Sequence, residues 1–491
     1  MPRMVKSPLV QFALRHKLAL LLLLVVVVRL AVYVAFPGVF AWDQTGAIHG
    51  SAAYDTYARN LLATGQYGMT AGVADAMLPP AYSIALAGLY GWFGRSALVV
   101  ALWHIALDVL TVYAVFELGR RLFRGWGVGR AEAVGWLAGL FTALYPYLVF
   151  QNLTLIDTPL FMALLYLWLL MMVALRDRQR LNARTVMLGV LGGAVLALGT
   201  LTRPVLAPMA VLVAVWFLFR LSLAQTILRL LPVAVVSLLV LGVWSARSSQ
   251  IYGGFVLMSV NTGANFFQGN NPDTIPYLRA GYDVQWIGYQ SPDRSDDARV
   301  ADSQMLQSGL TFLRENPGLI PELLWLKFAV HWSIDISPYR NPVDGELPRL
   351  NYDGSALQSE QGEALELGGL PPGDPVGAYS GSLFDQIGRP VHILYFGSLL
   401  VLALIGFVAS FRLWREVSLL WFLQLVMTAL YMVFHSSTRY RVPTDPALFL
   451  FSGAALVWLV NRMRARRAHE DSPAPAVPAE TGASDSAETP A

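Results

Sequence analysis

The stretch FHSSTRYRVPTDP places two guanidinium groups at a short junction between two long apolar segments. Arg439 and Arg441 flank Tyr440 there. Arginine keeps its charge at every physiological pH, and its planar fork binds phosphate oxygens in pairs. Ionisable side chains at membrane depth are costly and usually face a cavity or a partner. We therefore predict that these three residues bind the phosphate of a membrane lipid.

Other ionisable residues flank apolar segments in the same way. Asp157 precedes one segment, Arg203 and Arg247 follow two others, and Asp55 lies in the amphipathic stretch 50–64. A carboxylate near the arginines would take the proton of an attacking hydroxyl, and the arginines would stabilise a departing phosphate. The simpler alternative is that these charges pair with one another or extend to the membrane surface. Their presence on one face favours group transfer from a lipid phosphate.

Membrane helices must position these residues. The chain has 491 residues, of which 55% are hydrophobic and 14% charged, whereas about a quarter of a soluble domain is charged. A run of about 17–25 apolar residues can span a membrane. We predict an all-α polytopic membrane protein with ten spans, at 18–36, 97–118, 133–149, 158–175, 185–201, 205–221, 229–246, 392–411, 417–434 and 445–461.

The basic residues indicate the orientation of the spans. Of the 35 Lys and Arg residues, 20 lie in six short segments on one side. Cytoplasmic loops are enriched in Lys and Arg, so the N-terminus is expected inside and the candidate site outside. The 20 are Arg3, Lys6, Arg15, Lys17, Arg120, Arg121, Arg124, Arg130, Arg176, Arg178, Arg180, Arg184, Arg220, Arg229, Arg412, Arg415, Arg462, Arg464, Arg466 and Arg467.

The spans imply a domain organisation. Two apolar stretches, 79–94 and 321–334, are short for a span and are expected to lie at the outer membrane surface. The expected regions are a cytoplasmic N-terminus (1–17), a transmembrane region (18–246) with a first outer loop (37–96), a long outer loop (247–391), C-terminal transmembrane helices (392–461) and a disordered cytoplasmic tail (462–491).

The composition argues against several kinds of chemistry. The chain has no cysteine, which excludes disulfides, thiol catalysis and thiolate metal sites. Its seven histidines are scattered without a metal-binding spacing. The net charge of +3 is too small to indicate nucleic acid binding. We expect no cofactor and no metal site.

Further residues of the outer segments are candidates for substrate binding. The stretch NTGANFFQGNNPD offers amides and aromatic rings of the kind that bind sugars. The candidates are Tyr54, Tyr57, Asn265, Asn270, Lys327 and His331. Two charges fall inside spans, Arg29 and Asp108, and each needs a buried partner.

An ordered set of stretches resembles the bacterial GT-C glycosyltransferases related to protein O-mannosyltransferases and lipid A aminoarabinose transferases. The resemblance covers roughly residues 18–461. The stretches are YARNLLATGQYG, PPAYSIALAGLYGWFG, DVLTVYAVFELGRRLF, ALYPYLVFQNLTLIDTPLFMALL, LTRPVLAP, WSARSSQIYGGFVLMSVNTGANFFQGNNP and RYRVPTDPALFL. It implies a GT-C-type helical bundle with juxtamembrane helices and a long outer loop.

The resemblance also implies roles for individual residues. The first outer loop should supply the catalytic acid, Asp157 should match a second acidic position, and 439–441 should lie near the lipid phosphate. The family usually has an acid about four residues before the position of Tyr54, where this chain has Gly50. We therefore expect Asp55 to act as the base, with Asp43 as the alternative.

The implied activity is an inverting transfer of a sugar from a polyprenyl-phosphate carrier to an acceptor hydroxyl, on the outer face of a bacterial plasma membrane. The acceptor stays open between a lipid, a glycan and a protein. Two other classes remain: a transporter or flippase for a lipid-linked substrate, and an inactive relative that binds lipid phosphate. A transporter is expected to carry charges within its spans and an internal repeat, and no repeat is evident.

Overall fold

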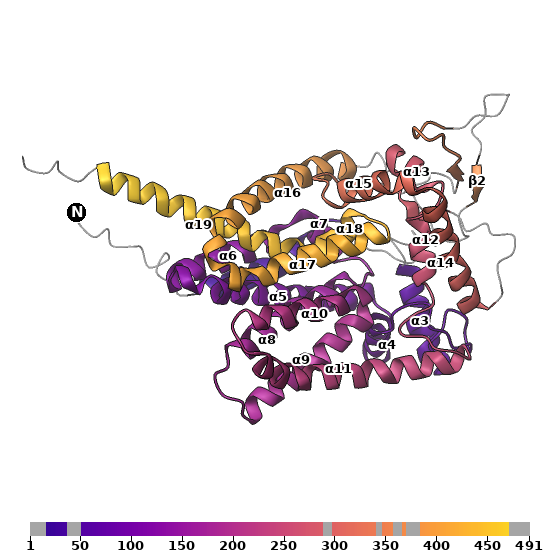
Figure 1. Ribbon diagram of the computed structural model, residues 1–491, viewed down its shortest axis with the longest axis horizontal. Helices are drawn as coiled ribbons and strands as arrows, with labels where there is room; N and C mark the ends of the chain where they lie inside the picture. Colours follow the sequence, from indigo (N-terminus) through magenta and orange to yellow (C-terminus); the bar gives the residue numbers. More distant parts are fainter. Residues whose placement is uncertain are drawn as a thin grey trace, which may run out of the picture.

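The computed structural model describes residues 16–36, 51–287, 297–339, 346–356, 366–369 and 383–470. Long helices run side by side along the long axis of the molecule (Figure 1). They are α2 (Lys17–Ala35), α5 (Ala97–Leu122), α6 (Val128–Leu144), α8 (Thr158–Asp177), α9 (Ala183–Thr202), α10 (Ala207–Leu218), α11 (Leu223–Ile251), α16 (Leu383–Ala409), α17 (Trp414–Val433) and α19 (Asp445–Glu470).

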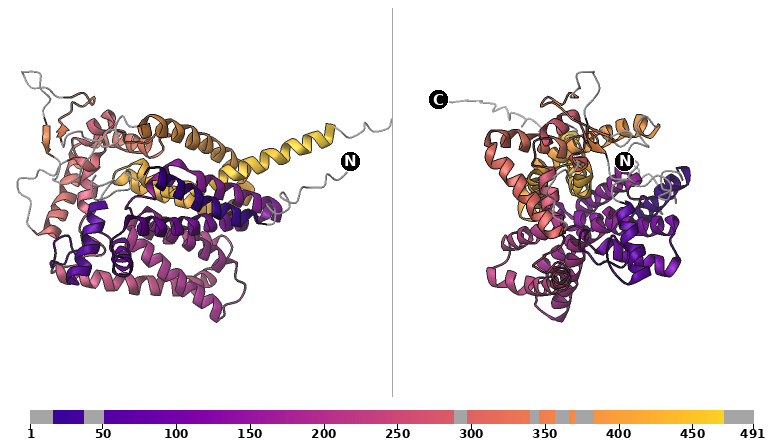
Figure 2. Two further views of the ribbon diagram at one scale, coloured as in Figure 1. Left: turned by 180° about the vertical axis from the view of Figure 1, so that it is seen from behind. Right: turned by 90° about the vertical axis from the view of Figure 1, so that its right-hand side faces the viewer.

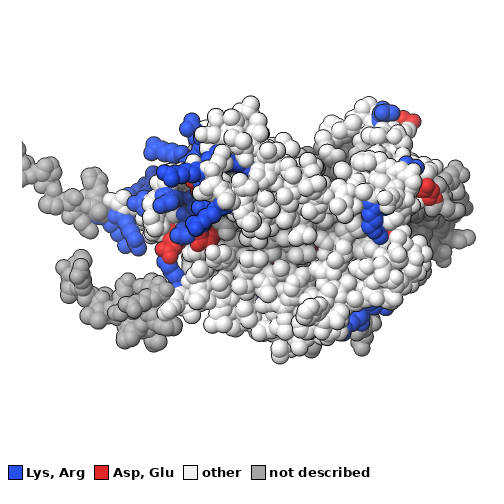
Figure 3. All heavy atoms as spheres, turned by 90° about the horizontal axis from the view of Figure 1, so that it is seen from below, with Lys and Arg blue, Asp and Glu red and all other residues white. Residues whose placement is uncertain are grey.

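Eight of the helices in the described ranges are long and apolar enough to cross a membrane. Two expected spans are shorter: α6 has 17 residues and α10 has 12. In the space-filling view a broad band free of charged side chains separates a basic end from the scattered charges of the other end (Figure 3). The protein is therefore an all-α multi-pass membrane protein, which confirms the predicted class.

Small residues let the central helices pack closely. A Cβ atom added to Gly119 of α5 would stand 2.5 Å from Cα of Gly135 in α6, closer than atoms can approach. The core beside this contact is made of large side chains from α8, α17 and α19, among them Trp168, Leu420 and Phe449. Close backbone approach at small residues is a common way to hold membrane helices together.

The two charges predicted inside spans pair with each other. Arg29 of α2 donates from Nε to Asp108 of α5, and from Nη1 to the backbone oxygen of Ala143 at 2.9 Å. Asn152 donates to the second oxygen of Asp108 at 2.6 Å. Arg29 and Asp108 are almost fully buried, at 1% and 3% exposure. Each charge thus satisfies the other, and the pair fixes α2 against α5.

Short elements gather at the end of the bundle opposite the extension of α19 (Figures 1 and 2). The helices there have at most 18 residues, and β1 and β2 form a two-stranded antiparallel sheet in which Glu346 lies opposite Gly369. The elements are α3 (Ser51–Thr64), α4 (Ala81–Phe93), α7 (Pro146–Gln151), α12 (Thr262–Gln268), α13 (Thr274–Ala280), α14 (Ala298–Glu315), α15 (Ile320–His331), α18 (Thr438–Arg441), β1 (Glu346–Pro348) and β2 (Glu366–Gly369).

The element boundaries differ from the expected ones at several points. Helix α11 continues to Ile251 and α16 begins at Leu383, so both reach into the expected outer loop. Helix α19 runs on to Glu470, beyond the expected end of the last span. The apolar stretches 79–94 and 321–334 form α4 and α15, of 13 and 12 residues. At about 1.5 Å per residue such helices are too short to cross a membrane.

Candidate functional site

A buried ion pair between Asp157 and Arg203 forms the centre of the candidate site. Arg203 donates from Nε to one carboxylate oxygen at 2.8 Å and from Nη2 to the other at 2.6 Å. Nη2 also donates to the hydroxyl of Thr158 at 2.8 Å. The third nitrogen, Nη1, is buried without a hydrogen-bond partner among the described residues. The pair therefore retains one donor for an anionic ligand.

Prolines at two helix ends place this pair. Pro204 disfavours a helical conformation at the residue before it, so α9 ends at Thr202 and Arg203 is extended, with φ −141° and ψ 114°. Pro159 occupies the first turn of α8, where its missing N–H is not needed. Asp157 thus stands just before α8, and both side chains lie at the same end of the bundle.

Tyr54 and Arg439 complete the surroundings of Asp157. Burial by itself would raise the pKa of Asp157, but the charge and hydrogen bonds of Arg203, the charge of Arg439 and a hydrogen bond from Tyr54 hold it below its usual value. Burial and the Asp157 charge raise the pKa of the Tyr54 hydroxyl. Asp157 is therefore an anion at neutral pH, flanked by two guanidinium groups.

An aromatic stack borders the site. The rings of Tyr431 and Tyr440 are parallel, with centroids 4.7 Å apart. The ring of His331 also stacks on Tyr431, with the two centroids 5.7 Å apart. His435 lies 3.0 Å from the Tyr440 hydroxyl, and its second nitrogen lies 3.3 Å from the backbone oxygen of Asn265. Aromatic faces of this kind are suited to the apolar faces of sugars.

Asp283 is an acidic residue of the site that sequence reasoning missed. It follows α13, is 6% exposed and accepts a hydrogen bond from the Gln285 backbone at 3.1 Å. Burial raises the pKa of Asp283 to about 6, although the Gln285 N–H and the charge of Arg439 act in the opposite direction. No sequence signal marked it, since an Asp in a polar outer loop is ordinarily exposed.

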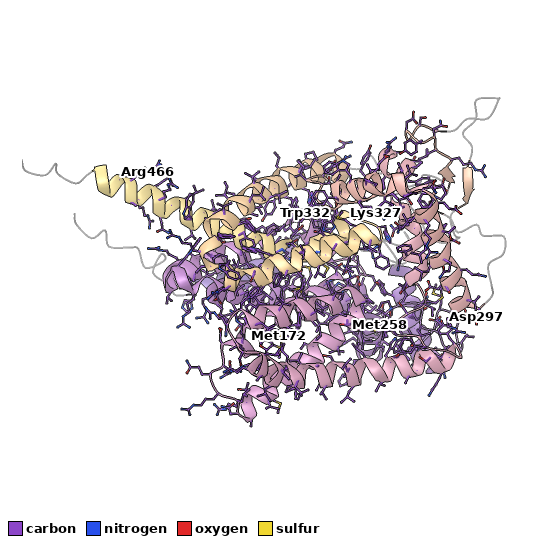
Figure 4. All side chains as sticks on the ribbon, viewed as in Figure 1. Met172, Met258, Asp297, Lys327, Trp332 and Arg466 are labelled. Carbon is purple, nitrogen blue, oxygen red and sulfur yellow. The ribbon has the colours of Figure 1, made fainter. Side chains whose placement is uncertain are left out.

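Lys327, a sequence candidate, is buried next to the stack. Its ammonium donates to the side-chain oxygen of Asn270 at 2.9 Å and to the backbone oxygen of Val433 at 3.4 Å. Burial lowers the pKa of Lys327 to about 7. Figure 4 labels Lys327 of α15 and Trp332, the residue that follows this helix, both well away from Arg466. The contacts of Asn270 and Lys327 join the outer loop to the end of α17.

Arg441 points away from the centre of the site. It is fully buried, pairs with Asp445 at 3.1 Å and donates to the backbone oxygens of His331 and Ser333. Tyr145 donates to the other oxygen of Asp445 at 2.8 Å. These contacts tie α15 to the start of α19. Arg441 thus has a structural set of partners, although its Nη2, like Nη1 of Arg203, is buried without a hydrogen-bond partner among the described residues, so its role at a phosphate stays a prediction. Arg439, two residues earlier, acts on Asp157 and Asp283.

Asp55 is also engaged by structural partners. Its carboxylate accepts hydrogen bonds from Tyr90 and Arg95, each at 2.9 Å, and pairs with Arg59 at 2.9 Å. These contacts hold α3 against α4 and the turn after it. The carboxylate oxygens are thus occupied by three donors, so the geometry does not favour Asp55 as the proton acceptor. Asp43, the alternative, lies outside the described residues.

Two more candidates hold the first outer loop in place. Arg247 donates to the backbone oxygens of Asp75 and Tyr67, at 2.9 and 3.0 Å. Tyr57 donates to the carboxylate of Asp75 at 2.6 Å. Both therefore organise the loop near Asp75 instead of joining Arg203. Within the described ranges no three His, Asp or Glu side chains are grouped to hold a metal ion.

Comparison with known protein families and with curated proteins finds no match in sequence. Solved structures of the oligosaccharyltransferase of Archaeoglobus fulgidus are similar in fold. The apo form gives a TM-score of 0.52 at 13% identity over 93% of this chain. The complex with an inhibitory peptide and a dolichol-phosphate gives 0.53 at 14% identity over 93%.

The chain has the GT-C-type helical fold. This agrees with the fold that the sequence stretches indicated, while membership of the GT-C superfamily and the nearer relationship to protein O-mannosyltransferases or aminoarabinose transferases remain predictions. The chain spans about half of those archaeal structures, 52% of their length. At such low identity the likeness concerns the fold alone.

Proposed function

We propose that this GT-C chain is an inverting glycosyltransferase that uses a polyprenyl-phosphate sugar. The carrying observation is the buried Asp157–Arg203 pair beside Arg439, with one guanidinium nitrogen of Arg203 left for a ligand. A lipid phosphate lies at the depth of helix ends in the membrane, where these groups stand. The archaeal complex with a dolichol-phosphate supports a lipid-phosphate ligand in this fold.

In the proposed reaction the acceptor oxygen attacks the anomeric carbon of the donor. The bond between that carbon and the phosphate oxygen breaks, and polyprenyl phosphate departs. The configuration at the anomeric carbon is thereby inverted. Arg203 and Arg439 stabilise the negative charge that grows on the phosphate. Asp157 holds Arg203 in position by its two hydrogen bonds.

The acceptor hydroxyl must lose its proton to a base. We assign this role to Asp283, because its raised pKa of about 6 is close to the value at which a carboxylate works well near neutral pH. Asp283 lies near enough to Arg439 for that charge to lower its pKa, as it does for Asp157. The assignment replaces our expectation for Asp55.

The proposed setting is the outer face of a bacterial plasma membrane. The basic residues cluster at one end of the molecule (Figure 3). Arg176 lies in the last turn of α8, whereas Asp157 precedes its first turn. Since basic ends face the cytoplasm, the site would face the periplasm. A transporter is less well supported, because the two charges predicted deep inside spans, Arg29 and Asp108, pair with each other.

The decisive experiment measures transfer of radiolabelled sugar from a panel of polyprenyl-phosphate donors, by the full-length protein in nanodiscs with membranes that supply acceptors. Wild type should transfer label, and Arg203→Ala should not. Asp55→Asn should retain transfer, and Arg279→Ala, which alters an exposed pair with Glu322, serves as the control. The assignment of Asp283 as the base is wrong if Asp55→Asn folds correctly but is inactive. It is also wrong if Asp43→Asn is inactive while Asp283→Asn is active. Lack of transfer from every donor would overturn the function.

A further inference from the structure

A basic cavity lies at the end of the bundle opposite the candidate site. It has a volume of about 950 Å³ and is lined by the C-terminal ends of α5 and α8, the connection from α10 to α11, and the start of α17. Helix α8 joins the two regions: Asp157 precedes its first turn and Arg176 lies in its last. Twenty helical residues separate the regions by roughly 30 Å, so the cavity is a separate place on the molecule.

Arginine dominates the lining of this cavity. Only two lining residues are acidic, Asp177 and Glu416. The eight arginines are Arg121, Arg124, Arg176, Arg178, Arg220, Arg229, Arg412 and Arg415. The enrichment of basic residues in cytoplasmic loops accounts for their presence at this end. It does not account for their arrangement around one hollow.

Part of the set is held rigidly. Arg176 and Arg220 both pair with Glu416. The Arg176 guanidinium lies 3.3 Å from the ring centroid of Trp216. Arg229 donates to the backbone oxygen of Arg178 at 2.8 Å. Arg176 and Arg229 are 3% and 4% exposed, and in each the Nε atom is buried without a hydrogen-bond partner in the described part of the chain.

Of the remaining arginines, Arg121 pairs with Glu117 at 3.4 Å, and the other four lack a counter-ion among the described residues. Arg124, Arg178, Arg412 and Arg415 form no ion pair with any residue that the structure describes. Like charges that converge on one hollow repel each other, and a bound anion removes that repulsion. Unpaired guanidinium groups with fixed neighbours are the usual lining of a phosphate site. The charge of the cavity therefore calls for an anionic ligand.

Exposed apolar side chains beside the cavity indicate that the ligand is a lipid. Trp414 lines the cavity and is 37% exposed. Phe411, which precedes lining residue Arg412, and Leu223, which lies between lining residues Leu221 and Gln225 in the chain, are 57% and 64% exposed. We propose that the cavity binds the phosphate head group of an anionic membrane lipid, whose acyl chains cover these side chains. Basic pockets between helices at the cytoplasmic side are suited to such head groups. The proposal does not depend on the transferase activity.

Native mass spectrometry of the full-length protein tests the proposal. The protein is released from nanodiscs of phosphatidylcholine that contain a small fraction of cardiolipin, and the retained lipid is counted. Wild type should retain cardiolipin, and the triple variant Arg124→Ala, Arg178→Ala, Arg412→Ala should retain at least about tenfold less, because it lacks three phosphate donors. The matched control removes three charges from the same end but outside the cavity: Arg462→Ala, Arg466→Ala, Arg467→Ala. It should bind like wild type.

Further arms separate the possible ligands. If inorganic phosphate displaces cardiolipin at millimolar concentration, the cavity is a site for a soluble anion and the lipid proposal is wrong. Equal loss of retained cardiolipin in both triple variants would also overturn the proposal, because any basic surface would then be enough to bind the lipid. Should the first triple variant fail to fold, the single charge reversal Arg412→Glu replaces it. Unchanged retention in that folded variant counts against the site.

Discussion

Arginine collects at both ends of the bundle, but in two different states. At the site end Arg203 and Arg441 are buried, and each is held by a carboxylate and by further oxygens. At the basic end most arginines are partly exposed around a cavity, and only some have a carboxylate partner. Arginine thus forms fixed ion pairs in a polar core at one end of the bundle, and it lines a cavity suited to anions at the other.

The difference follows from the surroundings of the charges. A buried ion pair interacts in a medium of low dielectric constant and is weakly screened by salt. Its geometry is fixed, which an enzyme needs in order to stabilise a transition state. Half-exposed arginines are screened and mobile, and they attract anions without fixing one orientation. Substitutions at the two ends should therefore have effects of different size and kind.

The largest effect is expected at Arg203. Its replacement by Ala leaves Asp157 buried without its partner and removes a phosphate donor, so transfer should fall by about 100- to 1,000-fold. Initial rates in nanodiscs measure the loss. Arg203→Lys, which keeps the charge but not the fork, should recover only part of it. A rate within about twofold of wild type for Arg203→Ala would show that this pair takes no part in transfer.

Asp283→Asn should lower the rate by about 100-fold or more, as expected for loss of a general base. In wild type the rate should rise with pH through about 6, since the carboxylate accepts a proton only when it is ionised and its pKa is about 6. The variant should lose this step. Asp335→Asn is the matched control, because Asp335 is an outer-loop Asp paired with Arg389. A variant that keeps the wild-type pH profile contradicts the assignment.

Arg441 and Arg439 should differ in what they affect. Arg441→Ala leaves Asp445 fully buried without a counter-ion, so the free energy of unfolding should drop by about 3–5 kcal/mol. Arg439→Ala should lower transfer and change stability far less. Thermal unfolding in detergent, measured beside transfer, separates the two effects. If Arg441→Ala is as stable as wild type, its proposed structural role is wrong.

The smallest effect is expected at the basic end. Arg220 pairs with Glu416, but its side chain is 50% exposed, so Arg220→Ala should cost at most about 1 kcal/mol of stability. Sugar transfer should be unchanged. Raising the salt concentration should reduce the difference in stability between the variant and wild type. A loss of transfer at low salt would link the two ends of the bundle and break the contrast between them.

Several features of the fold could be predicted from the sequence because they depend on local composition. Apolar runs fix where membrane helices form, since backbone groups in lipid must be satisfied within each segment. Prolines such as Pro159 and Pro204 mark helix boundaries through their own geometry. For this reason the sequence predicted the helical class and placed Asp157 and Arg203 on the same side of the membrane. It did not predict that these two residues pair with each other.

The assignment of side chains to faces required the tertiary structure. Tyr54 and Asp55 are neighbours on α3, yet successive helical residues point about 100° apart, so Tyr54 meets Asp157 while Asp55 meets Tyr90 and Arg95.

The sequence by itself determined which long apolar segments are helices and near which of their ends the predicted charges stand. Only the tertiary structure decided which charges meet: Arg29 with Asp108 across 79 residues, Asp157 with Arg203, and Arg441 with the end of α15. The physical reason is that burial and pairing depend on contacts between distant segments, whereas helix formation in a membrane depends on each segment alone.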